Sequence, residues 1–234
     1  MDLREAKVLV TGGSSGIGLE TARMLKEAGA EVAICARHQD KLEKAASRIG
    51  ALAIQADVSQ EDDVKRMVKT TAEAFGGYNV LINNAGYGIF AELTDLDAQD
   101  FRDVLNVNTV GAMMVGRESA RHFIEQDYGN IINISSTAGK KGFAGGTAYC
   151  ASKFALGAMT ECWRSELRPH NIRVMQVNPS EVQTRFAENA GGEKRAFNKT
   201  KLIAEDIAHT IVAMLGMHNR GFIPETSVWA TNPQ

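Results

Sequence analysis

The segment YCASK places the phenol of Tyr149 four residues before the amine of Lys153. On a helix, positions i and i+4 are neighbours on one face, so both side chains can reach the same point in space. A positioned phenol is one of the groups that enzymes use for proton transfer. The same spacing also arises when two polar side chains share one face of an ordinary helix. The motif is therefore a candidate catalytic pair whose meaning depends on the residues around it.

A glycine-rich segment near the start of the chain, TGGSSGIG at residues 11–18, joins an apolar run to an amphipathic one. A dinucleotide pyrophosphate needs a tight turn, bare backbone and the free N–H groups of a helix N-terminus. The spacing is Gly-x-x-x-Gly-x-Gly, which differs from the commoner Gly-x-Gly-x-x-Gly fingerprint. The alternative is a glycine-rich turn without a ligand. We expect cofactor contacts from six residues: Gly12, Ser14, Ser15, Gly16, Ile17 and Gly18.

The end of the second apolar run bears on which dinucleotide binds. A carboxylate there would bind the ribose 2′-hydroxyl of NAD and repel a 2′-phosphate, but the chain has Ala36, Arg37 and His38. Arg37 can make a forked, charge-assisted contact to a phosphate. We therefore predict NADP(H), with a solvated surface charge as the alternative reading of Arg37. Asp57, with Val58 beside it, is placed to accept a hydrogen bond from the adenine amino group.

The elements that must position these residues alternate between strand and helix along the whole chain. Ser59 and Asp62 resemble a capping box before a helix that extends to Phe75. Alternation over the full length predicts an α/β fold: a doubly wound, Rossmann-type parallel sheet of about seven strands, with helices on both faces and a single domain at 1–234. Predicted strands lie at 7–11, 31–36, 52–56, 80–84, 130–135, 172–178 and within 221–229, and other predicted helices at 17–28, 40–49, 98–126, 149–167 and 205–216.

The composition narrows the class of protein. The 234 residues are 44% hydrophobic and 23% charged, with a net charge of −2, which argues against a nucleic-acid partner. Three cysteines without metal-ligand spacing fit a reducing compartment, and we predict no metal site. The chain has no apolar run long enough to cross a membrane, and we expect no signal peptide at its start. We expect a cytoplasmic protein.

Taken together, the motifs resemble those of the short-chain dehydrogenase/reductases. TGGSSGIG, NNAG at residues 83–86, Asn108, Ser136 and YCASK follow the order and spacing typical of that family. The similarity extends from about residue 8 to 184 and is greatest to the compact single-domain branch that includes many 3-oxoacyl-thioester reductases.

The resemblance implies a catalytic set of Asn108, Ser136, Tyr149 and Lys153. A free phenol titrates at about 10, and a nearby ammonium should lower that pKa. Tyr149 would then exchange a proton with the substrate oxygen, and Ser136 would donate a hydrogen bond to the same oxygen. In the family, the lysine also holds the nicotinamide ribose, and the asparagine supports a proton-relay water. Further cofactor contacts are implied at Asn84, Ala85, Gly86, Tyr149, Lys153, Pro179, Val182 and Thr184.

The chain departs from the family pattern after the sixth strand. Ser180 stands where the family usually has glycine, and such a residue needs backbone that is open to a side chain. Glu181 places an unusual negative charge near the expected nicotinamide site. Its carboxylate could contact the substrate or face solvent. The segment at about 185–203 is expected to be a substrate lid. Its basic residues, with Lys140 and Lys141, would suit an anionic carrier-linked substrate, and a solubilising loop is the alternative.

Three functions follow from these patterns. The first is an NADP(H)-dependent reductase of a small-molecule carbonyl, with a carrier-linked 3-oxoacyl thioester as one candidate substrate. The second is an NADP-linked alcohol or sugar dehydrogenase. The third is a regulator that binds NADP(H) without turnover. The complete catalytic set argues against this third function, because a sensor would not need the catalytic acid. The resemblance also implies a homodimer or homotetramer, formed through the helices near 98–126 and 149–167.

Overall fold

A single parallel sheet forms the centre of the molecule in the computed structural model, which describes residues 1–184, 186 and 196–232. Its strand order is β3-β2-β1-β4-β5-β6-β9, and every neighbouring pair is parallel. The direction of winding reverses between β1 and β4, and ligands of such sheets bind at this point. The strands are β1 (Lys7–Thr11), β2 (Glu31–Ala36), β3 (Leu52–Gln55), β4 (Val80–Asn83), β5 (Gly129–Ile134), β6 (Ile172–Pro179) and β9 (Glu225–Val228).

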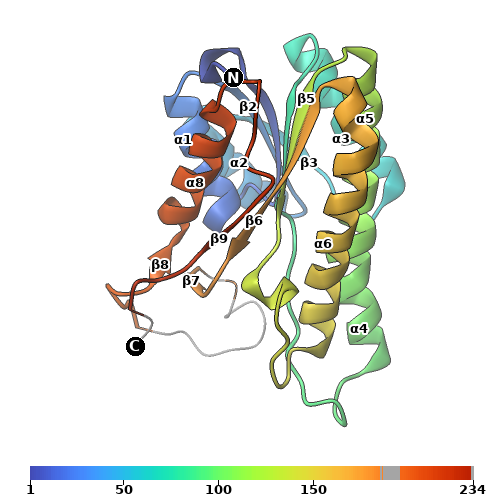
Figure 1. Ribbon diagram of the computed structural model, residues 1–234, viewed down its shortest axis with the longest axis vertical. Helices are drawn as coiled ribbons and strands as arrows, with labels where there is room; N and C mark the ends of the chain where they lie inside the picture. Colours follow the sequence, from blue (N-terminus) through green and yellow to red (C-terminus); the bar gives the residue numbers. More distant parts are fainter. Residues whose placement is uncertain (185, 187–195, 233–234) are drawn as a thin grey trace.

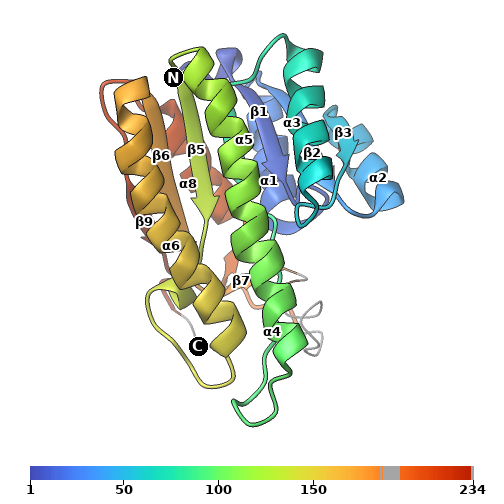
Figure 2. The same ribbon diagram turned by 90° about the vertical axis from the view of Figure 1, so that its right-hand side faces the viewer.

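Helices cover both faces of this sheet, as Figure 1 shows with the sheet seen from its edge. One layer contains α1, α2 and α8, and the other contains α3, α5 and α6, which lie in front of the sheet in Figure 2. The predicted doubly wound fold is confirmed. The helices are α1 (Gly16–Glu27), α2 (Gln39–Ile49), α3 (Glu61–Phe75), α4 (Ala98–Leu105), α5 (Ala112–Glu125), α6 (Thr147–Leu167) and α8 (Ala204–Gly216).

The core lies in two apolar layers, one on each side of the sheet. Strand side chains alternate between them: Val8 and Val10 of β1 join the layer under α1 and α8, whereas Leu9 joins the layer under α3 and α5. Every residue of β4, β5 and β6 is buried, which fits the Ile, Val and Leu content of these strands. This packing fixes the positions of the strand ends that carry the candidate site.

The helix predicted near 98–126 is interrupted by a π-helical segment. Residues Asn106–Gly111 form this segment between α4 and α5. Such widened turns are frequent at functional sites. The segment contains Asn108, whose side chain it directs into the protein, where the residue is 1% exposed.

The capping box predicted from Ser59 and Asp62 is wrong. Helix α3 begins at Glu61, and its N-cap residue Gln60 makes no capping bond through its side chain. Ser59 instead donates hydrogen bonds from its backbone N and its Oγ to Asp57 Oδ1, at 2.9 and 2.7 Å. The Ser59 hydroxyl therefore binds the Asp57 carboxylate and does not cap the helix.

A second, two-stranded sheet lies beyond the main sheet near the ends of its strands. It pairs β7 (Val182–Gln183) with β8 (Leu202–Ile203). Gln183 reinforces the pairing, because its Nε2 donates to the Asn198 carbonyl at 2.7 Å. Among the described residues, no helix is long and apolar enough to cross a membrane.

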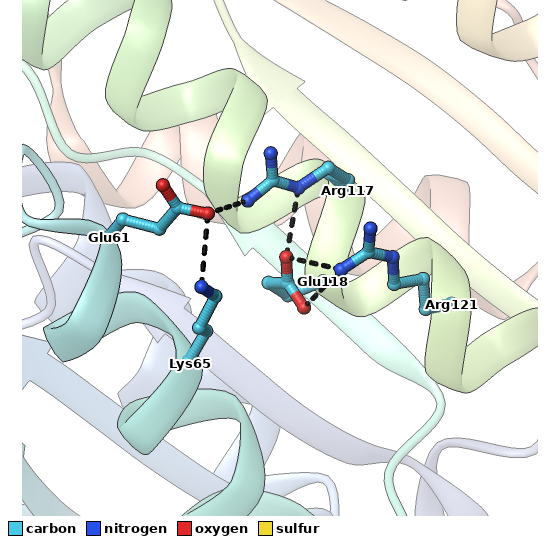
Figure 3. Close-up of polar contacts among 5 residues, drawn as sticks. All are labelled: Glu61, Lys65, Arg117, Glu118 and Arg121. Carbon is cyan, nitrogen blue, oxygen red and sulfur yellow. Dashed lines mark hydrogen bonds and ion pairs between the residues drawn. The ribbon is translucent and has the colours of Figure 1, made fainter.

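A network of five charged side chains joins α3 to α5 on the surface (Figure 3). Arg117 is central, because its Nη2 lies 2.6 Å from Glu61 Oε1 and its Nε lies 2.9 Å from Glu118 Oε1. Lys65 and Arg121 extend the network at 3.2 and 3.0 Å. Since Arg117 contacts both helices, it holds together elements that are 56 residues apart in sequence.

We expect Arg117→Ala to lower the midpoint of urea unfolding by roughly 0.2–0.5 M, because it removes the cation that joins Glu61 of α3 to Glu118 of α5. The shift should shrink in 1 M NaCl, where charges are screened over about 3 Å. Lys69→Ala is the matched control, since Lys69 pairs loosely with Glu73 at 3.8 Å within α3. Equal shifts for both variants would contradict a role in joining the helices.

Candidate active site

The glycine-rich loop connects β1 to α1 and packs directly against the loop after β4. Gly12 has φ +65°, and a Cβ at this position would lie 3.0 Å from Ala85 Cα. A Cβ at Gly18 would lie 2.5 Å from Asn84 Nδ2 and 2.6 Å from the Gly12 carbonyl oxygen. The glycines at these two positions therefore allow two loops to approach more closely than side chains would permit.

Thr11 ties the same two loops together through one hydroxyl. Its Oγ1 accepts hydrogen bonds from the backbone N atoms of Asn84 and Ala85, at 2.9 and 3.0 Å. In return, Asn84 Nδ2 donates to the Thr11 carbonyl at 2.9 Å. Sequence reasoning assigned no role to Thr11, although its place at the end of a buried strand was a usable signal.

A groove of about 510 Å³ runs across the ends of the central strands at this junction. At α1, which borders it, the N-cap residue Ser15 makes no capping bond through its side chain. An uncapped helix N-terminus is suited to binding phosphate. Of the residues predicted to contact a cofactor, the groove is lined by Gly12, Ser14, Ser15, Gly16, Ile17, Arg37, His38, Asp57, Val58, Asn84, Ala85, Gly86, Tyr149, Lys153 and Thr184.

Three of the predicted cofactor residues lie outside this groove. Gly18 packs against Asn84 and the Gly12 carbonyl, so its role in the structure is to shape the loop. Pro179 and Val182 line a neighbouring cavity instead. Conversely, the groove includes Lys41 and Tyr87, which sequence reasoning missed. Lys41 lies four residues after Arg37, and that spacing near the start of α2 was an available signal.

One end of the groove is cationic. Arg37 and His38 follow β2 and are exposed, and Lys41 lies in the first turn of α2. Within the described part of the chain, no carboxylate forms an ion pair with Arg37 or Lys41. Both cations are therefore free to bind an anion.

Tyr149 and Lys153 share one face of α6, as their spacing predicts. The Lys153 Nζ lies 5.8 Å from the centre of the Tyr149 ring and donates to the Ile134 carbonyl at 2.9 Å. Ser136 lies just beyond β5, held by hydrogen bonds from the Ala138 backbone N at 3.1 Å and to the Pro179 carbonyl at 3.4 Å. The structure therefore gathers the three residues from one helix and one strand end.

The expected lowering of the Tyr149 pKa is wrong for this structure. Burial raises the pKa of Tyr149 to about 12, although a hydrogen bond with Ser136 opposes the shift. Burial also lowers the pKa of Lys153 to about 8. The physical reason is that loss of hydration disfavours the charged form of each group, while the lysine directs its hydrogen bond to a backbone carbonyl.

Asn108 clamps the loop that follows β4. Its Oδ1 accepts from the Tyr87 backbone N at 3.0 Å, and its Nδ2 donates to the Tyr87 carbonyl at 2.8 Å. The same Nδ2 donates to Ser152 Oγ at 3.0 Å, and Ser152 donates to the Tyr149 carbonyl at 2.7 Å. A chain of hydrogen bonds thus links Asn108 to the backbone of Tyr149. Ser152 was missed from the sequence.

A second cavity, of about 890 Å³, adjoins the groove, and Tyr149 lines both. Ser135, Ser136 and Thr184 form part of its wall, and six aromatic side chains are among the other lining residues. A molecule in this cavity can therefore meet the Tyr149 hydroxyl while a second molecule occupies the groove.

Comparison with known proteins decides the family of this chain. A family model described as short chain dehydrogenase matches residues 6–195. The chain belongs to the short-chain dehydrogenase family. Members of this family are oxidoreductases that act on alcohols or carbonyls with a nicotinamide cofactor, so the chain is an enzyme of this class by membership.

Individual relatives of this short-chain dehydrogenase differ in substrate and cofactor. An NADP-dependent 3-hydroxy acid dehydrogenase of Schizosaccharomyces pombe is 31% identical, with 96% of this chain and 92% of the relative covered. The structure of an alcohol dehydrogenase from Thermococcus sibiricus, complexed with 5-hydroxy-NADP, has a TM-score of 0.89 at 26% identity over 98% of this chain and 100% of its own. A 3-ketoacyl-(acyl-carrier-protein) reductase from Brucella melitensis, complexed with NADH, has a TM-score of 0.90 at 26% identity over 98% of both chains.

The residues that depart from the family pattern are accommodated locally. Among the described residues other than glycine, only Asp127 and Asn171 have positive φ, so Ser180 lies in backbone that tolerates a side chain. Ser180 donates its backbone N to the Val228 carbonyl at 2.9 Å. Glu181 is exposed, lines the second cavity and forms an ion pair with Lys201 at 2.6 Å, so the solvent-facing carboxylate and the substrate contact both stay open.

The predicted lid at 185–203 falls partly outside the described residues. Arg185, Lys194 and Arg195, three of its basic residues, lie in the part that is not described. Of the described basic residues, Lys201 pairs with Glu181, and Lys140 pairs with Glu225 at 2.7 Å. The prediction of an anionic, carrier-linked substrate depended on this positive charge. The two ion pairs neutralise part of it.

Proposed function

We propose that this short-chain dehydrogenase is an NADP(H)-dependent carbonyl reductase acting on a small-molecule ketone or aldehyde. The observation that carries the proposal is the position of Tyr149, which borders both the dinucleotide groove and the adjoining cavity and lies beside Ser136. A hydroxyl in this place can meet the oxygen of a substrate carbonyl.

The groove fits a dinucleotide with a 2′-phosphate. The uncapped N-terminus of α1 and the hydroxyls of Ser14 and Ser15 suit the pyrophosphate, and the unpaired cations Arg37 and Lys41 suit the extra phosphate. When bound, the cofactor supplies the hydride. Carboxylates that would repel a 2′-phosphate are missing at residues 36–38.

The protein residues would then manage the proton and the orientation of the substrate. Tyr149 donates its hydroxyl proton to the carbonyl oxygen as negative charge develops there. Ser136 donates a second hydrogen bond to that oxygen. Lys153 would hold the ribose next to the reaction. Asn108 would keep the loop at Tyr87 and the backbone of Tyr149 in register through Ser152.

The direct test follows the oxidation of NADPH, with NADH in parallel, against a panel of ketones, aldehydes, keto sugars and 3-oxoacyl thioesters. Turnover of a carbonyl with NADPH preferred is the expected result. Binding of NADPH without turnover of any carbonyl, or of any alcohol with NADP⁺, would favour the non-catalytic regulator instead. Preferential oxidation of alcohols or sugars at neutral pH would favour the dehydrogenase alternative. Association into a homodimer or homotetramer remains part of this proposal.

The choice of cofactor can be tested at Arg37. We expect Arg37→Ala to raise KM for NADPH by about 10- to 100-fold and to leave KM for NADH nearly unchanged, because only NADPH carries the phosphate that the guanidinium binds. Arg48→Ala is the matched control. It also removes one arginine, but Arg48 lies on α2 and does not line the groove. An equal loss with both cofactors would contradict the phosphate contact.

A further inference from the structure

Aromatic side chains are concentrated in the cavity beside Tyr149. The chain has nine Phe, four Tyr and two Trp, which is 6% of its residues. Six of these fifteen line this one cavity, and they come from separate segments that the fold brings together. The six are Phe90, Phe143, Tyr149, Phe186, Phe197 and Trp229.

The inner rings contact one another around the catalytic phenol. The ring centres of Phe90 and Tyr149 lie 5.7 Å apart in an edge-to-face arrangement, and those of Tyr149 and Phe186 lie 5.3 Å apart. Phe143 extends the group, with its ring centre 5.9 Å from that of Phe90. Gly88 lies beneath: a Cβ there would lie 3.0 to 3.3 Å from atoms of Phe90, Phe186 and Tyr149. A bare backbone thus lets three rings converge.

Four of these rings remain open to solvent. Phe90 and Phe143 are 41% and 52% exposed, and Phe197 and Trp229 are 70% and 66% exposed. Large apolar side chains that gather around a hollow on a protein surface mark sites where a ligand covers them. The exposed rings line the same cavity as the phenol, so the ligand that covers them is the substrate.

The charged groups of this cavity are largely neutralised. Glu181 and Lys201 form an ion pair at 2.6 Å, and Lys140 is held outside the cavity by Glu225. Lys141 lines the rim and is exposed. The uncharged polar groups closest to the reaction are Ser135 and Ser136, which adjoin the phenol. Thr137, Ser180, Gln183, Thr184 and Asn198 also line the cavity, so it combines a small number of uncharged polar side chains with six aromatic rings.

We propose that the substrate is a ketone that carries an aryl group, with the carbonyl at Tyr149 and Ser136 and the aryl ring against Phe90 and Phe143. This inference rests on the proposed carbonyl reductase activity and names its substrate class. A polyol would leave its hydroxyls unpaired among these rings, and that desolvation is costly. A carrier-linked thioester would need cations, two of which are already paired. An aryl ring instead gains edge-to-face and stacked contacts in addition to burial.

The test compares two ketones with the same carbonyl environment. 4-Phenyl-2-butanone and 4-cyclohexyl-2-butanone have the same chain and differ only in the aromaticity of the ring. With NADPH, we expect kcat/KM for the phenyl ketone to be about 3- to 10-fold higher, as one or two aromatic contacts would produce. Fructose and a 3-oxobutanoyl thioester should be reduced more slowly than either. Equal rates for the two ketones, or faster reduction of fructose or the thioester, would overturn the proposal.

Substitutions of the cavity rings test which residues cause the preference for the phenyl ketone. Phe90→Leu and Phe143→Leu keep the apolar character and remove the rings, so each should bring the phenyl-to-cyclohexyl ratio towards one. Phe75→Leu, at the end of α3 and outside both cavities, should leave the ratio unchanged. Ratios that persist in both cavity variants would exclude these rings as the binding surface.

Binding to the Tyr149→Phe protein separates this proposal from the proposed activity. In the presence of NADPH, the fluorescence of Trp229 should report tighter binding of the phenyl ketone than of the cyclohexyl ketone. If no carbonyl is reduced by the wild type and the phenyl ketone still binds more tightly, the reductase proposal fails and the aryl site stands. If carbonyls are reduced with no preference in rate or binding, the aryl site fails and the reductase stands.

Discussion

Tyr149→Phe is expected to lower kcat for carbonyl reduction by about 10²- to 10⁴-fold, because it removes the only proton donor assigned to the substrate oxygen. The ring remains, so its packing against Phe90 and Phe186 at 5.7 and 5.3 Å is kept. Binding of NADPH should therefore change by less than about twofold. The measurements are kcat from NADPH oxidation and Kd from nicotinamide fluorescence.

The matched control is Tyr128→Phe, which removes a hydroxyl that contacts Asn219 at 3.4 Å and lines neither cavity. This variant should keep wild-type kcat. If Tyr149→Phe retained full turnover, the proton would have to come from another group, and the assignment of Tyr149 would be wrong. If Tyr149→Phe lost NADPH binding as well, the substitution would act by disturbing the cofactor groove and not by removing the proton donor.

Lys153→Met is expected to lower turnover by at least about 100-fold while making the folded protein more stable. Lys153 is 5% exposed, and its amine is held by the Ile134 carbonyl at 2.9 Å. Burial lowers the pKa of this amine from 10.5 to about 8, so below pH 8 the folded state carries a charge that the interior disfavours. That difference corresponds to about 3 kcal/mol, and removal of the charge should recover about 1–3 kcal/mol.

The pH dependence of stability distinguishes this cause from others. Between about pH 8 and 10.5 the unfolded chain binds the lysine proton and the folded chain does not, so stability rises with pH in this interval. From pH 8 to 9.5 the free energy of unfolding of the wild type should increase by about 1–2 kcal/mol relative to Lys153→Met. Tyr149 acts in the opposite direction only above about pH 10, because burial raises its pKa to about 12.

Urea unfolding of both proteins at pH 7.0, 8.0, 9.0 and 9.5 provides the measurement. A Met variant that is less stable than the wild type at pH 7 would mean that the hydrogen bond to Ile134 outweighs the burial of the charge. Parallel pH profiles would contradict the lowered pKa of Lys153. Turnover near the wild-type level would contradict its proposed role at the ribose.

Local pattern was sufficient to predict most of the fold and much of the candidate site. The Gly-x-x-x-Gly-x-Gly loop, the short strand segments rich in Val and Ile and the Tyr-x-x-x-Lys pair depend on neighbours within one turn or one strand. The predicted strands were correct to within a few residues, since each buried strand has to be apolar whatever its partners are. Fifteen of the predicted cofactor residues line one groove, because parallel strands end at one edge of the sheet and bring the loops that follow them together.

Other features required the tertiary structure. The Thr11 hydroxyl serves the backbone of Asn84, 73 residues away, and Asn108 clamps Tyr87 from a π-helical segment that no periodicity revealed. Ser59 lost its capping role to the Asp57 carboxylate. The pKa of Tyr149 rises and does not fall, because burial, which depends on the whole fold, is the largest influence on it.

The aromatic cavity is the clearest case of a property that only the tertiary structure decided. Phe90, Phe143 and Trp229 lie on separate segments, and none of them belongs to a motif. The sequence by itself determined the family and the sheet and was sufficient to propose the reacting groups, because the motifs that carry them depend on short-range spacing. Which side chains line the cavity beside Tyr149 was decided by packing between distant segments, since the rings meet only after the chain has folded.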